Sequence, residues 1–453
     1  MYVKKLVIEN LKSFSRAEFD FSQENSNDFA GLSVLVGGNA SGKSSVLRLI
    51  AMALMGPDQS RQLMGDVSSW LSHGQTTGKC FVEFGYDAGL DKFASSGNRN
   101  RAFEAGLEWK REQIPISNTQ SFPARVPRLS AMEGTTRGEW AEKGPWNLNS
   151  TGWFGVGYGP FRRLRGSAQD ALKDALTPGP VGRFVSLFRE DVALSEAEEW
   201  LKKLRFQELE ARSSKKKGTV RQTILADVLK FLNDGLLPQG FRVQRVSSDD
   251  VWVGRDRINL TPMKELSDGC RSVYALMLDI IRQLSMVYAD AHLFKVMNDR
   301  IVVDLPGVVL IDEIESHLHP SWQREFPVWL KERFPRIQFI VSTHSPLVVQ
   351  AADPNGVFVL PMPGEESGLL RKLSGEESDR VRFGRAEKTL LGQAFGLQST
   401  RSKWAVAQIE EYRRMSGLQR AGRLTDAREQ SRFQDLKLTM QRQFEFEDSL
   451  EPK

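Results

Sequence analysis

The chain has 453 residues, a formal net charge of +5, 40% hydrophobic residues and 26% charged residues, which is ordinary for a soluble globular protein of two or three lobes. No run of about 18 apolar residues is present, so we expect no membrane span, and the first residues do not resemble a secretory leader. The two cysteines, Cys80 and Cys270, exclude a disulfide framework and a four-cysteine zinc site within one chain, which favours a reducing, cytoplasmic location.

The N-terminal part of the chain predicts a strand from Tyr2 to Ile8 with a hairpin partner from Ala17 to Phe21. The apolar run Leu32 to Val36 then leads into a glycine-rich loop, Gly37-Gly38-Asn39-Ala40-Ser41-Gly42-Lys43-Ser44, and a helix is expected from Ser44 to Met55. The loop fits the pattern G-x-x-x-x-G-K-S/T, and a strand before it and a helix after it form the setting in which this pattern binds phosphate.

The residue types of this loop suit phosphate binding. Glycines let the backbone curl so that its N–H groups, up to Ser45 in the helix, point at phosphate oxygens. Lys43 supplies a mobile positive charge for the β- and γ-phosphates, and the Ser44 hydroxyl can ligate Mg²⁺. The sequence therefore predicts a site for ATP and Mg²⁺. The alternative is a glycine-rich turn beside a solvated lysine.

The middle of the chain changes character several times. Residues 87–152 are rich in Gly, Ser, Asn and Arg, which predicts long surface loops around an antiparallel sheet. A strand is expected from Phe154 to Pro160, mostly helix from Leu172 to Leu232, and two or three short strands from Phe241 to Leu260.

The segment Leu266-Ser267-Asp268-Gly269 precedes an amphipathic helix that begins near Arg271. Ser267 and Asp268 can cap this helix, and the N–H groups at its start can face an anion. Taken alone, the segment is an ordinary helix start. Its place between the glycine loop and the next two motifs is what suggests that Ser267 and Gly269 contact a nucleotide.

A buried strand is expected from Val308 to Ile311, and it ends in Asp312 and Glu313. An aspartate in this position can hold Mg²⁺, directly or through water, and the adjacent glutamate can orient or deprotonate the attacking water. A second buried strand leads into His344, whose imidazole can donate to the γ-phosphate. We therefore predict Glu313 and His344 as catalytic residues and Asp312 as a magnesium ligand.

Two further features have a structural and a functional interpretation. His317 and His319 alternate with carboxylates, but a subunit interface beside the nucleotide is favoured over a metal site. The polar C-terminal region carries two apolar stripes separated by Gly422, which predicts a helical hairpin or bundle that packs on the chain or docks a partner. The stripes are Ala405, Ile409 and Tyr412, and Phe433, Leu436, Met440 and Phe444.

In this order the motifs resemble the ABC-type ATPase heads of the SMC, RecF and OLD group. Leu266 to Gly269 looks like the ABC signature, Asp312-Glu313 like the end of Walker B, and His344 like the switch histidine. Further segments are similar to SMC and RecF heads or to prokaryotic defence ATPases, including those of Septu-type anti-phage systems. These are Asn10–Phe14, Gly157–Arg163, Leu310–Gln323 and Phe395–Ser402.

The resemblance implies an α/β fold with a P-loop parallel sheet, an antiparallel β subdomain, a helical lobe and the C-terminal helices. The corresponding division is an N-terminal ATPase lobe at 1–165, a helical insertion at 166–240, a second ATPase lobe at 241–365 and a C-terminal helical region at 366–453. It also implies a homodimer or higher homo-oligomer in which Lys43 of one copy and Ser267 of another hold the same ATP. Asp268 and Cys270 depart from the common Leu-Ser-Gly-Gly-Gln signature, and no Q-loop glutamine can be assigned.

Two functions fit this resemblance, and a third comes from another class of ATPase. The favoured one is an ATP-hydrolysing defence ATPase that regulates an HNH-type or other nuclease partner, because the chain shows no nuclease motif of its own. The second is a RecF-like repair ATPase that binds DNA, with Arg162, Arg163, Arg165 and Lys215 to Lys217 as phosphate contacts. The third, the energy subunit of a membrane transporter, is disfavoured because Lys43 and Ser267 are too far apart in the chain for a compact transporter ATPase.

Overall fold

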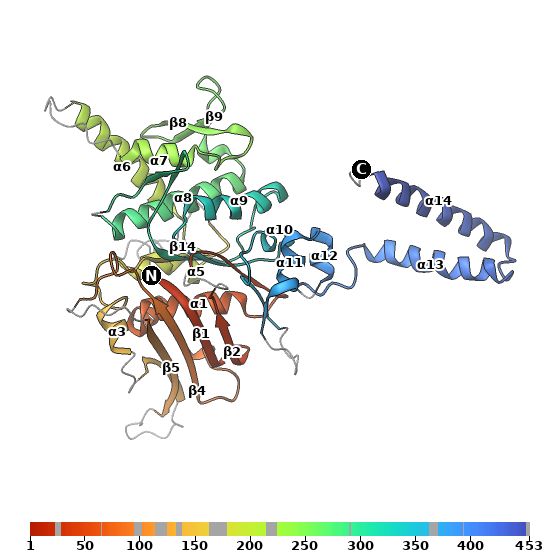
Figure 1. Cartoon of the computed structure of the whole chain (residues 1–453), viewed down its shortest axis with the longest axis horizontal. Helices are drawn as coiled ribbons and strands as arrows, with labels where there is room; N and C mark the ends of the chain where they lie inside the picture. The colour runs from red at the N-terminus through yellow and green to blue at the C-terminus, as the bar shows by residue number, and fades with distance from the viewer. Residues whose placement is uncertain are drawn as a thin grey trace, which may run out of the picture. The chain divides into compact units, whose positions relative to one another are not determined.

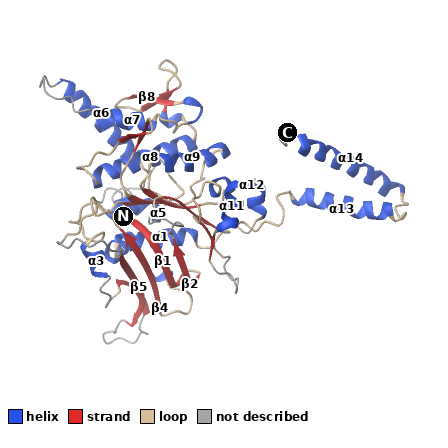
Figure 2. Cartoon of the chain, viewed as in Figure 1, coloured by secondary structure: helices blue, strands red, loops and turns tan. Residues whose placement is uncertain are grey.

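A computed structural model describes residues 1–22, 29–64, 66–94, 102–113, 125–132, 138–162, 179–213, 224–289, 291–361, 370–392 and 394–449. The chain divides into two compact units, Met1–Ala386 and Glu387–Lys453 (Figure 1). The first unit holds both large sheets, and the second is helical (Figure 2). Arg163, Arg165 and Lys215 to Lys217 lie outside the described residues, and the division into four parts stays a prediction.

The central sheet of the first unit has six strands within the described ranges, in the order β16-β15-β3-β14-β13-β7. Neighbouring strands are parallel except for β15 with β16. Every residue of β13 and β14 is buried, so their apolar runs fit a sheet covered on both faces. The bounds are β3 (Gly31–Val36), β7 (Gly155–Tyr158), β13 (Gly307–Ile311), β14 (Ile337–Ser342), β15 (Val357–Val359) and β16 (Arg371–Leu373).

A second, antiparallel sheet has the order β2-β1-β4-β5-β6 over the part of the chain that the structure describes. Its last two strands lie in the interval for which the sequence predicted long loops around an antiparallel sheet, and Ala105, Leu107 and Trp109 on β5 are fully buried. The alternation of these apolar residues was the signal for a strand. The bounds are β1 (Tyr2–Leu11), β2 (Phe14–Asp20), β4 (Thr77–Gly85), β5 (Phe103–Gln113) and β6 (Arg125–Ala131). The α/β fold with a parallel and an antiparallel sheet is confirmed.

Helix α1 (Lys43–Met55) packs between these two sheets, since its apolar residues share one core with β1, β4, β13 and β14. It begins directly after Gly42, at φ +94°, and ends at Gly56, at φ +85°. Both residues need glycine, because a side chain is strained in this left-handed region. The same core includes residues of α2 (Pro57–Met64), α3 (Gly138–Lys143) and α5 (Pro180–Phe188).

Further helices and short strands complete the first unit. Helix α8 (Asp268–Val287) is linked to β7 by the Tyr158 hydroxyl, which donates to Asp279 Oδ2 at 2.9 Å. Burial raises the pKa of Asp279. The other elements are α6 (Ser195–Ser213), α7 (Ile224–Leu232), α9 (Pro320–Arg333), α10 (Pro346–Val349), α11 (Gly375–Phe383), β8 (Arg242–Val246), β9 (Val251–Gly254), β10 (Thr261–Pro262), β11 (Lys295–Met297), β12 (Arg300–Val302) and the short 3-10 turns Ser68–Trp70, Pro238–Gly240 and Met263–Glu265.

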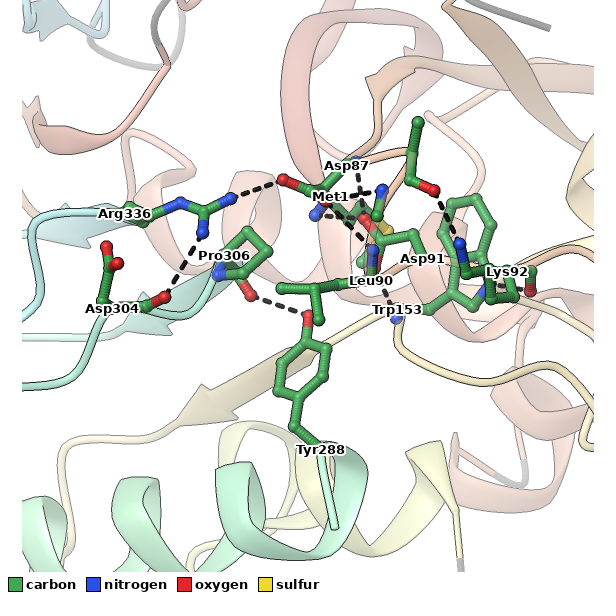
Figure 3. Close-up of polar contacts among 12 residues, drawn as sticks. Met1, Asp87, Leu90, Asp91, Lys92, Trp153, Tyr288, Asp304, Pro306 and Arg336 are labelled. Carbon is green, nitrogen blue, oxygen red and sulfur yellow. Dashed lines mark hydrogen bonds and ion pairs between the residues drawn. The ribbon is translucent and has the colours of Figure 1, made fainter. Parts of the chain in front are cut away.

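A polar cluster joins the two sheets where β7, β13 and β14 begin (Figure 3). The buried Asp91 carboxylate pairs with the Met1 amino group at 2.7 Å and accepts from the Trp153 backbone N–H at 2.8 Å. Arg336, which precedes β14, pairs with Asp87. The cluster therefore fixes the amino-terminal edge of the parallel sheet, opposite the edge where the predicted nucleotide residues lie.

The second unit begins at Glu387, the second residue of α12 (Ala386–Leu391). It also contains α13 (Lys403–Arg420) and α14 (Ala427–Ser449). Asp426 caps α14 by accepting bonds from the N–H groups of Arg428 and Glu429. The chain turns between α13 and α14 at Gly422, at φ +65°. Helices α13 and α14 share a small core of Met415, Leu424, Phe433 and Leu436. Over the described residues of the whole chain, we find no helix with the length and apolar character of a membrane span.

Candidate nucleotide-binding site

The predicted nucleotide residues meet at the carboxyl edge of the parallel sheet. Strands β3, β13 and β14 are adjacent and parallel, so the segments that follow them must lie side by side. A cavity of about 240 Å³ opens there. Its lining consists of Asn39, Ala40, Ser41, Gly42, Lys43, Ser44, Ser45, Asp312, Glu313 and His344.

The glycine loop has the curled backbone that phosphate binding requires. Ala40 has φ +64° and Gly42 has φ +94°. A Cβ on Gly42 would lie 2.6 Å from the Phe14 ring, and one on Gly37 would lie 2.6 Å from Ser41 Oγ. Gly38 is joined to Ser41 by a backbone bond of 3.3 Å. Gly42 is therefore required by close approach as well as by backbone angle, and Gly37 by close approach.

Lys43 is held inside the loop. Its ammonium donates to the carbonyl oxygens of Gly37 and Gly38, both at 2.9 Å, and only 6% of the residue is exposed. Burial lowers the pKa of Lys43, although the nearby carboxylates of Asp312 and Glu313 oppose this shift. An anion in the cavity would compensate the buried charge, which is what a phosphate group does in such a loop.

Asp312 is buried, and its carboxylate is oriented by the Ser342 hydroxyl, which donates to Oδ1. Ser44 lies across the same cavity. A hydroxyl and a carboxylate are hard oxygen donors of the kind that bind Mg²⁺, with substrate phosphates and waters completing the octahedron. The residues present therefore fit the predicted metal.

Glu313 has a strained backbone, with φ +45°. Left-handed geometry costs a non-glycine residue about 1–2 kcal/mol, so the surrounding contacts must hold it. The Glu313 N–H donates to Ser342 Oγ at 2.8 Å, and the Ser316 hydroxyl donates to Glu313 Oε2 at 3.1 Å. Glu313 is thereby held by Ser342 and Ser316 while it lines the cavity.

The Arg162 side chain stabilises this strained turn by hydrogen bonds to its backbone. Its guanidinium is buried and donates to the carbonyl oxygens of Asp312, Glu313 and Ile314 at 2.9, 3.1 and 3.3 Å. Burial lowers the pKa of Arg162 to about 10. The sequence suggested Arg162 as a DNA contact. That expectation is wrong, because the side chain is buried and its N–H groups donate to backbone carbonyls in the interior.

His344 is an exposed residue of the cavity wall, and its loop is anchored by Glu315. The His344 N–H donates to Glu315 Oε1 at 2.5 Å, and the Thr343 hydroxyl donates to Oε2 at 2.6 Å. This contact was not predicted from the sequence, although the place of Glu315 two residues after Glu313 was a signal. His319 does not join a metal cluster within the described residues; it caps α9 by accepting from Ser321 N–H at 3.3 Å.

Ser267 and Gly269 lie outside this cavity in the single chain. Ser267 is exposed at the N-cap of α8, where its side chain makes no capping bond. Gly269 is buried against the turn after β13, and a Cβ there would lie 2.4 Å from the His317 carbonyl oxygen. The start of α8 therefore packs closely against the turn that follows β13, while Ser267 itself is exposed.

Parts of the chain are similar to two families of known proteins. Residues 163–350 match the family described as AAA domain, putative AbiEii toxin, Type IV TA system, and residues 5–124 match a family described as AAA domain. Among solved structures, an SMC head bound to the C-winged helix domain of ScpA has a TM-score of 0.46 and 16% identity, and covers 84% of this chain and 100% of that one.

Two curated relatives extend over most of the chain. A Septu protein PtuA from Bacillus mycoides (strain KBAB4) is 26% identical over 418 residues, 88% of this chain and 45% of the relative. A retron Vc95 probable ATPase from Vibrio cholerae serotype O1 biovar El Tor is 25% identical over 394 residues, 77% of this chain and 71% of the relative. The chain thus spans less than half the length of the PtuA protein that it matches.

Both family matches are to AAA domains, and between them they include the glycine loop, Asp312, Glu313 and His344 of the cavity. Within that class the chain is related to the PtuA proteins of Septu systems and to retron ATPases. The resemblance predicted from the motifs is confirmed.

Proposed function

We propose that this protein binds ATP with Mg²⁺ and hydrolyses it in a site that two copies complete. The observation that carries the proposal is the distribution of the motifs. One chain brings the glycine loop, Asp312, Glu313 and His344 around a single cavity, but leaves Ser267 exposed outside it. A second copy facing the cavity would supply the missing donor, and a symmetric dimer would have two such sites.

Each residue then has a defined task. Loop N–H groups and Lys43 bind the phosphates, and Mg²⁺ held by Ser44 and Asp312 would neutralise negative charge on the β- and γ-phosphate oxygens. The Glu313 carboxylate accepts a hydrogen bond from water and orients it for in-line attack, and His344 donates to the γ-phosphate. Ser267 of the second copy would donate to the same phosphate.

A test of the shared site is Ser267→Arg. A bulky cation at this exposed position should block the approach of the second copy, so ATP-dependent dimerisation measured by light scattering should be lost. Nucleotide binding by the single chain should stay within about threefold of the parent, because Ser267 is not part of the cavity of its own chain.

The matched control is Ser248→Arg, at another exposed serine, between β8 and β9. This variant should dimerise with ATP like the parent. Dimerisation of Ser267→Arg at parental ATP concentrations would contradict the shared site.

We further propose a role in anti-phage defence, in which ATP-dependent closure regulates a nuclease partner. The names of the Septu and retron relatives support this assignment. In this proposal DNA cleavage is performed by the partner and not by this chain. Incubating the purified chain with DNA and Mg²⁺ tests whether cleavage needs the partner. Robust cleavage by the chain alone would exclude this part of the proposal.

A RecF-like role in DNA repair is the alternative function. Arg162 cannot serve this function as a phosphate contact, because its side chain is buried and bonded to the Glu313 turn. Binding of DNA with a steep dependence on salt concentration would favour this alternative.

A further inference from the structure

Glu315 holds the loop of His344 with both oxygens of its carboxylate. Oε1 accepts from the His344 backbone N–H at 2.5 Å, and Oε2 accepts from the Thr343 hydroxyl at 2.6 Å. Hydrogen bonds to an ionised carboxylate are among the strong ones in proteins. The turn after β13 and the loop after β14 are therefore joined at the cavity edge, beyond the backbone pairing of the two strands.

The same loop is fastened on its other side. Thr343 Oγ1 also accepts from the Ser345 N–H at 3.0 Å, and the Ser345 hydroxyl donates to Gln323 Oε1 on α9 at 2.7 Å. Gln323 in turn donates through Nε2 to the Leu318 carbonyl at 2.9 Å. The bonds form a closed path from the Glu313 turn through Glu315, the His344 loop and α9 back to the turn.

The imidazole of His344 has no such support. No hydrogen bond to its ring occurs in the described part of the chain, and the residue is exposed. Its direction therefore depends on the backbone to which it is attached. That backbone is fixed at its own N–H by Glu315.

We infer that Glu315 is a positioning residue that sets the direction of His344 relative to the γ-phosphate. The inference rests on the proposed ATP hydrolysis. It assigns Glu315 no contact with the nucleotide and no proton transfer. Loss of the clamp should lower turnover and leave ATP affinity nearly unchanged, because the glycine loop and Lys43 are not part of the bonded path.

The central variant is Glu315→Ala. Displacing a catalytic group by about 1 Å can cost as much as about 100-fold in rate, so we expect kcat to fall about 10- to 100-fold with KM within about threefold. Glu315→Gln should retain most of the activity. Its amide oxygen can accept from His344 N–H, and its amide NH₂ can donate to Thr343 Oγ1.

Two measurements separate positioning from other roles. In a His344→Ala background, Glu315→Ala should cause no further loss of turnover, since the two changes act through one group. Hydrogen exchange should show a protected His344 amide in the parent and in Glu315→Gln, and faster exchange in Glu315→Ala. The exchange measurement does not require turnover, so it tests the clamp even if the chain fails to hydrolyse ATP and the proposed function is lost.

The inference is overturned by any of three results. The His344 amide exchanges equally fast in the parent and in Glu315→Ala. Turnover falls equally in Glu315→Gln and Glu315→Ala, which would indicate a role for the negative charge. The loss caused by Glu315→Ala persists in full in the His344→Ala background, which would indicate general damage to the site.

Discussion

Lys43→Ala should abolish ATP binding at concentrations that saturate the parent. Two hydrogen bonds from a charged donor to phosphate are each worth about 1.5–3 kcal/mol, so the dissociation constant should rise at least about 100-fold. The variant also removes the two bonds from the ammonium to the Gly37 and Gly38 carbonyls, but the left-handed turn at Gly42 does not depend on the lysine side chain. Calorimetric titration with ATP and Mg²⁺ measures the change.

The matched control is Lys92→Ala. Lys92 also donates to a backbone carbonyl, that of Ala88 at 2.8 Å, but it lies outside the cavity. Its removal should leave ATP affinity as it is in the parent. Equal ATP affinity in Lys43→Ala and the parent would show that the glycine loop does not bind phosphate.

Glu313→Gln should bind ATP and hardly hydrolyse it. A positioned general base contributes about 10²- to 10⁴-fold to a rate, and an amide cannot accept the proton of water. Glutamine fits the same space, and its carbonyl oxygen can still accept from Ser316 Oγ. The Arg162 bonds to the three carbonyls do not depend on the side chain, so the strained turn should persist.

In this variant steady-state turnover should therefore fall while ATP affinity stays close to that of the parent, and the ATP-bound dimer should accumulate. The control is Glu83→Gln on β4, whose carboxylate lies near Lys4 outside the cavity. Turnover of Glu313→Gln at the parental rate would remove Glu313 from the catalytic step.

The local motifs were readable from the sequence because each combines a short pattern with its own secondary structure. Glycine at 42 is required by a left-handed angle, and the apolar run of β13 leads directly to Asp312. The α/β class followed from the same segments. The roles assigned to the site residues stay predictions, although the fold brings Lys43, Asp312, Glu313 and His344 to one cavity.

Contacts between distant parts of the chain could not be predicted from the sequence. Arg162 reaches the carbonyls of Asp312 to Ile314, and nothing local distinguishes its guanidinium from an exposed DNA contact. The role of Glu315 depends on β13 and β14 being neighbours, because only then does its carboxylate meet the His344 N–H. Strands β5 and β6 were obscured by the polar, glycine-rich composition around them, although Trp109 and its alternate neighbours marked one buried face.

The most direct test of a nucleotide bound by two copies is a mixing experiment with Lys43→Ala and Ser267→Ala, which removes the hydroxyl without adding a side chain that blocks dimerisation. Each protein alone should be inactive, since every dimer that it forms lacks one essential group at both sites. A mixed dimer has one complete site, with Lys43 from one copy and Ser267 from the other. Mixing should therefore restore about a quarter of the parental ATPase rate, because half of the dimers are mixed and one of two sites works. A mixture no more active than the two separate proteins would contradict a site completed in trans.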